Sequence, residues 1–181
     1  MISHEQMNSL CNWLEEDPDK IKFVGSSVPF FPDERGGRAN KGDKWLGFNE
    51  QRSEIIEHIR DNNIRHVVFL SGDVHSSFIS TLKMNGADGG EICIHSVISS
   101  PLYWPVNVLY GSLRWEKEDV VLAGTLTPGS KSKVPYYVRT PSPEYFVEED
   151  NFTEIRTNKD ELIVTVYGRA RNPINSQTLK I

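Results

Sequence analysis

The stretch Arg65-His66-Val67-Val68-Phe69-Leu70-Ser71-Gly72-Asp73-Val74-His75-Ser76-Ser77-Phe78 lies near the middle of the chain. Its first half is a continuous apolar run rich in β-forming residues, which predicts a buried strand. Gly72 allows a sharp turn where that strand leaves the sheet. Asp73 and His75 are two residues apart, so in an extended segment both side chains point to the same side. We therefore expect a carboxylate and an imidazole together at the end of a buried strand, where open α/β sheets usually bind ligands.

Asp73 and His75 are candidate metal ligands and candidate catalytic residues. Oxygen and nitrogen donors on a rigid element suit a divalent metal ion. The alternative is structural, because an Asp after a buried strand is often a turn residue or a cap, and the His could be hydrogen-bonded in the core. Two ligands also do not complete a hydrolytic centre, which needs at least three protein ligands and an open position.

Four segments of the chain resemble, in order and spacing, the PhoD-like (alkaline phosphatase D) branch of the metallophosphoesterases. Residues 69–77 are similar to the last metal motif of that family, and Ser99-Ser100-Pro101 is similar to the Ser-Pro turn that follows it. The segment Trp45-Leu-Gly-Phe-Asn-Glu-Gln-Arg52 resembles the Trp-x-Gly-aromatic-x-x-x-Arg segment that opens the preceding helix. Asn151-Phe152, followed by residues 162–166, resembles the closing hairpin. The resemblance covers about residues 5 to 168.

The resemblance implies an α/β fold of the αββα kind, in which two packed sheets are flanked by helices and the metals lie at strand ends. It implies hydrolysis of phosphate mono- or diesters with iron, calcium, manganese or zinc as the metal. At the matched positions, Asp73 would be a metal ligand able to bridge two ions, and His75 would bind one ion through a single ring nitrogen. The expected substrate is a phosphorylated small molecule or a phosphodiester.

The metal ligands that the family carries in its earlier half have no visible counterpart here. The other Gly-Asp pair, Gly42-Asp43, lies in a polar loop. Residues 1–168 therefore resemble the C-terminal half of such a domain, and residues 169–181 are expected to form a polar, irregular tail. We expect the missing N-terminal half or another protein chain as a partner, or self-association through an open sheet edge. The alternative function is a non-catalytic, partner-binding half-domain with an incomplete metal site.

Composition excludes several other classes. The chain has 181 residues and a formal net charge of -5, which suits one domain and argues against binding nucleic acid through positive charge. We expect no membrane span, because no apolar run approaches the required length of roughly 20 residues. The first residues show no signal-peptide pattern, and the sequence leaves the compartment open.

Periodicity, caps and turn residues predict the elements between these motifs. A capping box of Ser3 and Gln6 should open the first helix, and Asn49 should cap the second. We expect helices over residues 3–16 and 50–62, and strands over 21–28, 67–70, 78–84, 91–98, 120–126, 152–156 and 161–167.

Residues 29–48 form a long loop that is rich in Pro and Gly and contains Arg35, Arg38, Lys41 and Lys44. It could be a lid or phosphate-attracting rim over the metal site, or a solvated, mobile loop with few apolar anchors. Arg52 follows in the first turn of the second helix and is a candidate catalytic phosphate clamp. The favoured alternative is that Arg52 ties the loop to the helix through a carboxylate such as Asp43, because a cation there opposes the helix dipole.

The remaining candidates are expected to be structural. His95 lies in an apolar strand, where a hydrogen-bonded core residue is commoner than a ligand. Cys11 and Cys93 are expected to be buried thiols rather than a disulfide. The aromatic segment from Pro101 to Gly111 could line a cleft, but core packing is the commoner role; its aromatic residues are Tyr103, Trp104 and Tyr110.

Overall fold

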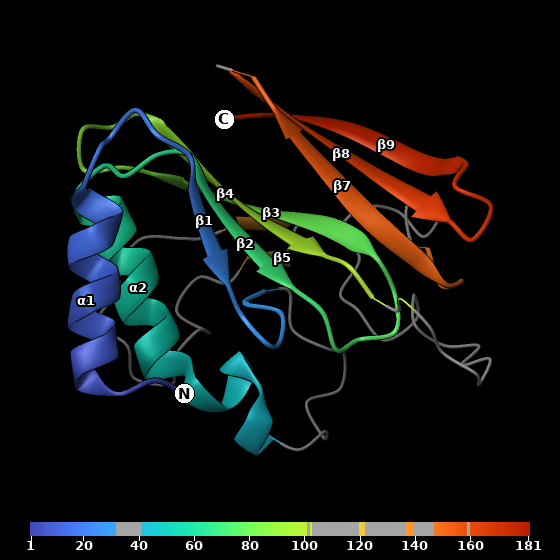
Figure 1. The fold of residues 1–181 in the computed structure, drawn as a ribbon. Helices are drawn as coiled ribbons and strands as arrows, with labels where there is room; N and C mark the ends of the chain where they lie inside the picture. The colour runs from blue at the N-terminus through green and yellow to red at the C-terminus, as the bar shows by residue number, and fades with distance from the viewer. Residues whose placement is uncertain (32–40, 101, 103–119, 122–136, 140–146, 159) are drawn as a thin grey trace.

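The computed structural model describes residues 1–31, 41–100, 102, 120–121, 137–139, 147–158 and 160–181. Two α-helices lie on one face of a six-stranded sheet, and a three-stranded sheet packs on its other face (Figure 1). The chain is therefore a mixed α/β protein with two sheets, as the sequence predicted. Within the described ranges, no α-helix covers the outer face of the smaller sheet.

The larger sheet has the strand order β1-β2-β4-β3-β6-β5. Its first three strands are parallel, so their carboxyl ends meet at one edge of the sheet, whereas the other strands continue in antiparallel pairs. The central position of β2 between two parallel neighbours explains its apolar sequence. The strands are β1 (Lys22–Gly25), β2 (Val67–Ser71), β3 (Phe78–Asn85), β4 (Glu91–Ile98), β5 (Val120–Val121) and β6 (Tyr137–Arg139).

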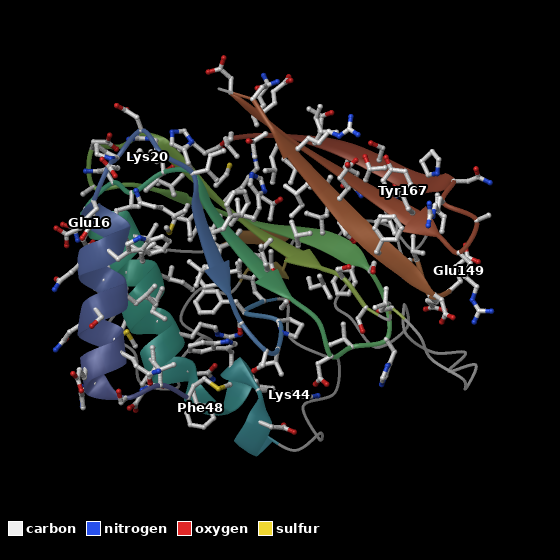
Figure 2. The ribbon with its side chains drawn as sticks, in the orientation of Figure 1. Glu16, Lys20, Lys44, Phe48, Glu149 and Tyr167 are labelled. Carbon is white, nitrogen blue, oxygen red and sulfur yellow. The ribbon has the colours of Figure 1, made fainter. Side chains whose placement is uncertain are left out.

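Helix α1 (His4–Glu15) begins at the predicted capping box. The hydroxyl of Ser3 accepts from the backbone N–H of Gln6 at 3.2 Å, and the Gln6 side chain accepts from the Ser3 N–H at 3.0 Å. Beyond its last turn, the buried ammonium of Lys22 donates to the carbonyls of Glu16 and Asp17. Glu16 is labelled at this end of the helix in Figure 2. A positive group there complements the helix dipole and ties α1 to β1.

Helix α2 (Asn49–Asp61) buries the predicted apolar stripe, since Ile55, Ile56 and Ile59 are all fully buried. The prediction that Asn49 caps this helix is wrong. Phe48 occupies the cap position without a side-chain hydrogen bond. The Asn49 amide is engaged elsewhere, because its oxygen accepts from Nη2 of Arg52 at 2.8 Å.

The core follows from the alternation of side chains along β2. Val67 and Phe69 pack with α1 and α2 on one face of the sheet. Val68 faces the other way and packs with Leu162 and Val164 of the smaller sheet. A strand covered on both faces needs apolar residues at successive positions, which is the pattern that the sequence showed.

The smaller sheet consists of β7 (Asn151–Thr157), β8 (Glu161–Gly168) and β9 (Pro173–Lys180), all antiparallel. The predicted closing hairpin is confirmed as β7 and β8. The prediction of an irregular tail is wrong, because β9 pairs with β8 along its length. The inward-facing positions of β9 include the polar residues Asn175 and Gln177. The sequence of β9 therefore does not alternate between apolar and polar residues, which is the pattern that would have predicted a strand.

The two described ends of the 29–48 loop are well anchored, so the expectation of few apolar anchors is wrong. Phe30 is completely buried and Trp45 is 5% exposed. Phe30 stacks on Phe69 of β2, with ring centroids 3.9 Å apart. The loop also contains short 3₁₀ helices, η1 (Lys41–Asp43) and η2 (Trp45–Phe48). Arg35 and Arg38 lie outside the described residues.

The other predicted strands are found with changed limits or only in part. β1 is shorter than the expected 21–28, and β3 and β4 form the expected hairpin. Of the strand expected over residues 120–126, β5 falls within the described part of the chain. Tyr103, Trp104 and Tyr110 lie outside the described residues.

Candidate functional site

The carboxyl ends of β1, β2 and β4 bring together segments that are distant in sequence. Ser26, just after β1, donates its backbone N–H to the carbonyl of Leu70 at 2.9 Å. Ser99, just after β4, donates its N–H to the carbonyl of Ser71 at 2.9 Å. The segments that follow β1 and β4 therefore lie on either side of the loop that follows β2. This loop carries Asp73 and His75.

Asp73 and His75 lie beyond the carboxyl end of β2, as predicted, but the extended backbone that the prediction assumed is wrong. Both residues are in the left-handed region, with φ of 68° for Asp73 and 57° for His75. Asp and His enter this region more readily than most residues, but still at a cost in strain. Asp73 is exposed and His75 is partly exposed.

Hydrogen bonds from the Ser-Pro turn hold this loop. The backbone N–H of His75 donates to the hydroxyl of Ser100 at 3.2 Å. The N–H of Ser100 in turn donates to the hydroxyl of Ser77 at 2.9 Å. The turn after β4 and the loop after β2 therefore form one hydrogen-bonded unit.

The smaller sheet contributes to the same unit. Ser77 and Val147 exchange both backbone hydrogen bonds, at 2.8 and 2.9 Å. The Ser77 hydroxyl lies 2.6 Å from Oδ1 of Asn151, the first residue of β7. The Asn151 amide nitrogen donates to the carbonyl of Glu149 at 2.6 Å, and Glu149 is labelled at this end of the smaller sheet in Figure 2.

The Trp45–Arg52 segment lies on the neighbouring side of the same sheet edge. The indole N–H of Trp45 donates to the hydroxyl of Ser26 at 3.1 Å. Arg52 is 1% exposed, and its Nη1 donates to the carbonyl of Phe30 at 3.1 Å. Together with its bond to Asn49, this places Arg52 as a link between the loop and α2. Two of its partners are therefore a carbonyl and an amide, and the suggested link to the Asp43 carboxylate stays a prediction.

An ion pair between a buried carboxylate and an exposed guanidinium lies next to Asn151. The Asp150 carboxylate has 8% of its side chain exposed and accepts from Nε of Arg169 at 2.7 Å. Arg169 follows β8, so this pair ties the start of β7 to the end of β8. Sequence reasoning assigned no role to either residue.

His95 is a structural residue, in agreement with the favoured prediction. Its Nδ1 lies 3.0 Å from the Thr81 hydroxyl, and its Nε2 lies 3.0 Å from the carbonyl of Lys180. Burial is the main cause that lowers the pKa of the imidazole. The hydrogen bond to the carbonyl of Lys180 raises this pKa, and the charge of the neighbouring Lys83 lowers it. A neutral His95 therefore links the larger sheet to β9.

Cys11 and Cys93 are free thiols, as predicted, and both are partly buried. Burial is the main cause that raises the pKa of each thiol above its ordinary value. Neither residue lies among the segments that meet at the site.

Comparison with known proteins identifies the family. The model of the PhoD-like phosphatase family matches residues 1–120, about two thirds of the chain, and the chain belongs to this family. Alkaline phosphatase D of Bacillus subtilis (strain 168) is 42% identical over 43 residues, which are 24% of this chain and 7% of that protein.

A solved structure of PhoD has the same fold, with a TM-score of 0.61 at 17% sequence identity. The match covers 98% of this chain and 32% of the PhoD chain. This chain therefore spans about a third of the length of that relative. No helix in the described part of the chain is long and apolar enough to cross a membrane.

The family implies a bound metal ion. Asp73 and His75 are suitable types of metal ligand, but they are too few to form a complete site. An exposed carboxylate and a partly exposed imidazole, on one short loop, are suitable donors. Among the described residues, however, no group of three or more His, Cys, Asp or Glu side chains could hold an ion. A hydrolytic centre needs further ligands.

Sequence reasoning located the loop but missed the residues that support it. Ser77 is the last residue of the 69–77 motif, but the sequence assigned it no role of its own. Its contacts with Ser100 and Asn151 span 23 and 74 residues of sequence. The available signal was that the resemblance had already marked the Ser99–Pro101 turn and Asn151. Their convergence on one serine is visible only in three dimensions.

Proposed function

We propose that this chain is the C-terminal half of a metal-dependent phosphoesterase that hydrolyses phosphate mono- or diesters. The observation that carries the proposal is the placing of Asp73 and His75 on the loop after β2, in a chain of the PhoD-like phosphatase family. Parallel strands whose carboxyl ends meet at one edge are the usual setting for a ligand site.

In this proposal Asp73 and His75 are metal ligands. The Asp73 carboxylate offers two oxygens and a negative charge, which suits a ligand shared by two ions, and His75 offers one ring nitrogen. A metal held by these residues would supply Lewis-acid chemistry, polarising the phosphoryl group and lowering the pKa of the attacking water. Iron, calcium, manganese and zinc all accept this pair of donors, so the two residues do not select the metal.

We assign Arg52 to the support of the site rather than to the substrate. A phosphate clamp has to reach the ligand, whereas the Arg52 side chain is almost completely buried and donates to the carbonyl of Phe30 and the amide of Asn49. Its guanidinium instead fixes the loop end against α2. This role agrees with the alternative that the sequence favoured.

The N-terminal half of the domain, or another chain, would supply the remaining ligands and the outer helical layer of an αββα sandwich. Among the strands that the structure describes, β1 lies at an edge of the larger sheet, with Phe23 38% exposed. An open edge is a ready position for another strand. In this scheme residues 1–168 are the C-terminal half of the domain, and β9 extends its smaller sheet.

The second candidate function is a non-catalytic half-domain that binds a partner. It is favoured by the shortage of ligands within the described residues. The two candidates differ in whether the completed protein hydrolyses a phosphoester.

The test is hydrolysis of bis(p-nitrophenyl) phosphate and p-nitrophenyl phosphate by the chain joined to, or mixed with, an N-terminal PhoD-like half. We expect metal-dependent turnover that falls by orders of magnitude in Asp73→Asn, because the substitution removes the negative charge but keeps the shape. Asp88→Asn is the matched control, since Asp88 is an exposed residue of the β3–β4 turn, paired with Arg65 at 2.9 Å. Turnover that survives Asp73→Asn, or exhaustive chelation, would refute the proposal.

A further inference from the structure

We propose that Ser77 is a positioning residue for the Asp73–His75 loop and that it acts through Ser100, with Asn151 of the smaller sheet as its anchor. The metal-binding part of this inference rests on the proposed function, whereas the structural part does not. It gives the smaller sheet a role at the site, although its strands carry none of the candidate ligands.

The Ser77 hydroxyl has a fixed direction. It can donate one proton, and the nearest acceptor is Oδ1 of Asn151 at 2.6 Å, compared with 3.3 Å to the carbonyl of Ser100. Asn151 is itself oriented, because its amide nitrogen donates to the carbonyl of Glu149. The amide oxygen must therefore face Ser77, which leaves the hydroxyl lone pairs to accept from the Ser100 N–H at 2.9 Å.

The backbone of Ser77 is fixed as well. Its N–H and carbonyl both pair with Val147, and the residue is fully buried. Asn151 is 4% exposed, so neither side chain can exchange its partner for bulk water. Buried polar groups in such a network are costly to leave unpaired. This favours one arrangement of the whole network.

The network ends at His75. Ser100 is held by Ser77 and accepts from the His75 N–H at 3.2 Å. His75 and Asp73 both have positive φ, and non-glycine residues stay in this region only where the surroundings over-determine them. A continuous path of hydrogen bonds thus leads from β7 through two serines to the backbone of the candidate ligand. Supporting residues of this kind set the orientation of metal ligands.

The experiment compares the isolated chain with Ser77→Ala by NMR, without metal and then with added Mn²⁺. Without metal, positive φ at Asp73 and His75 is read from intraresidue NOEs and three-bond couplings. With Mn²⁺, paramagnetic broadening of the His75 imidazole reports how closely the ion approaches. Ser96→Ala is the matched control: Ser96 is also fully buried, and its hydroxyl has no hydrogen-bond partner among the described residues.

We expect Ser77→Ala to lose the positive-φ signature at His75 and to need about ten-fold more Mn²⁺ for half-maximal broadening. Ser96→Ala should change neither signal. Unchanged φ and unchanged Mn²⁺ response in Ser77→Ala, or an equal change in Ser96→Ala, would overturn the inference.

A second variant covers the case in which Ser77→Ala does not fold. Ser100→Ala removes the acceptor of the His75 N–H at a partly exposed position and should produce the same two changes, more weakly. A wild-type loop in Ser100→Ala would contradict the proposed path. If φ changes as expected but Mn²⁺ broadens no His75 signal even in the wild type, the positioning role holds and the isolated pair of ligands does not bind Mn²⁺. The proposed metal function then fails only if the completed protein also shows no metal-dependent turnover.

Discussion

Phe30→Ala should be among the most destabilising single substitutions in this chain. Phe30 is completely buried, stacks on Phe69 with an interplanar angle of 2°, and meets Trp45 edge-on with ring centroids 4.9 Å apart. Truncation of a buried Phe to Ala costs about 3–5 kcal/mol. We expect the upper part of that range, because the aromatic pairs with Phe69 and Trp45, each worth roughly 0.5–1.5 kcal/mol, are lost as well.

Phe23→Ala is the matched control, since Phe23 is 38% exposed on the edge strand β1. Its partial burial predicts a cost of roughly 1–2 kcal/mol. The measurement is urea unfolding followed by tryptophan fluorescence and circular dichroism, with the slopes compared to confirm two-state behaviour. If Phe30→Ala costs no more than Phe23→Ala, the loop end is not anchored in the core and our description of it is wrong.

Two further predictions concern buried polar groups. The pKa of His95 is lowered in the folded protein, mainly by burial, so the unfolded chain binds a proton more readily. Stability should therefore be flat above the ordinary His pKa of about 6.5 and should decrease as the pH falls below it. Urea unfolding of the wild type and His95→Gln at about pH 5 and pH 8 checks this; equal pH dependence in the two proteins would contradict it. Ser96→Ala should leave the free energy of unfolding unchanged or raise it by up to about 1 kcal/mol, because it removes a buried hydroxyl that has no hydrogen-bond partner among the described residues. The same urea unfolding curves measure it. A decrease of more than about 1 kcal/mol would show that the hydroxyl is hydrogen-bonded.

Local signals predicted much of the fold. The Ser3–Gln6 capping box placed the start of α1, and the apolar run of Val67–Leu70 identified the strand that is covered on both faces. The turn at residues 85–90 correctly separated β3 from β4. Each of these features depends on neighbours within a few residues, which is the range over which caps, periodicity and turns act.

The errors have a common physical origin in distant contacts. Asn49 is a good cap by type, but its amide is engaged by Arg52. The 29–48 loop is polar in its middle, but its ends carry Phe30, Phe31 and Trp45. Phe30 is buried because Phe69, distant in sequence, offers a ring to stack on. β9 was missed because partly buried Asn175 and Gln177 face inward, so no apolar alternation marked it.

The candidate site was predicted in position but not in geometry. The sequence placed Asp73 and His75 after the buried strand, and the structure agrees. It could not show the left-handed backbone at both residues, because that conformation depends on surroundings far away in the sequence. In our proposal the distant residues are Ser100 and Asn151, which are joined to the loop at His75 and at the neighbouring Ser77.

The most direct test of the account is the number of metal ions bound by the completed protein, measured by native mass spectrometry. The chain is joined to an N-terminal PhoD-like half and exchanged into volatile buffer after incubation with Mn²⁺. We predict that Asp73→Asn loses at least one ion that the wild type and Asp88→Asn both retain. Equal metal content in Asp73→Asn and the wild type would show that Asp73 is not a ligand, and would contradict the assignment of a metal centre to the loop after β2.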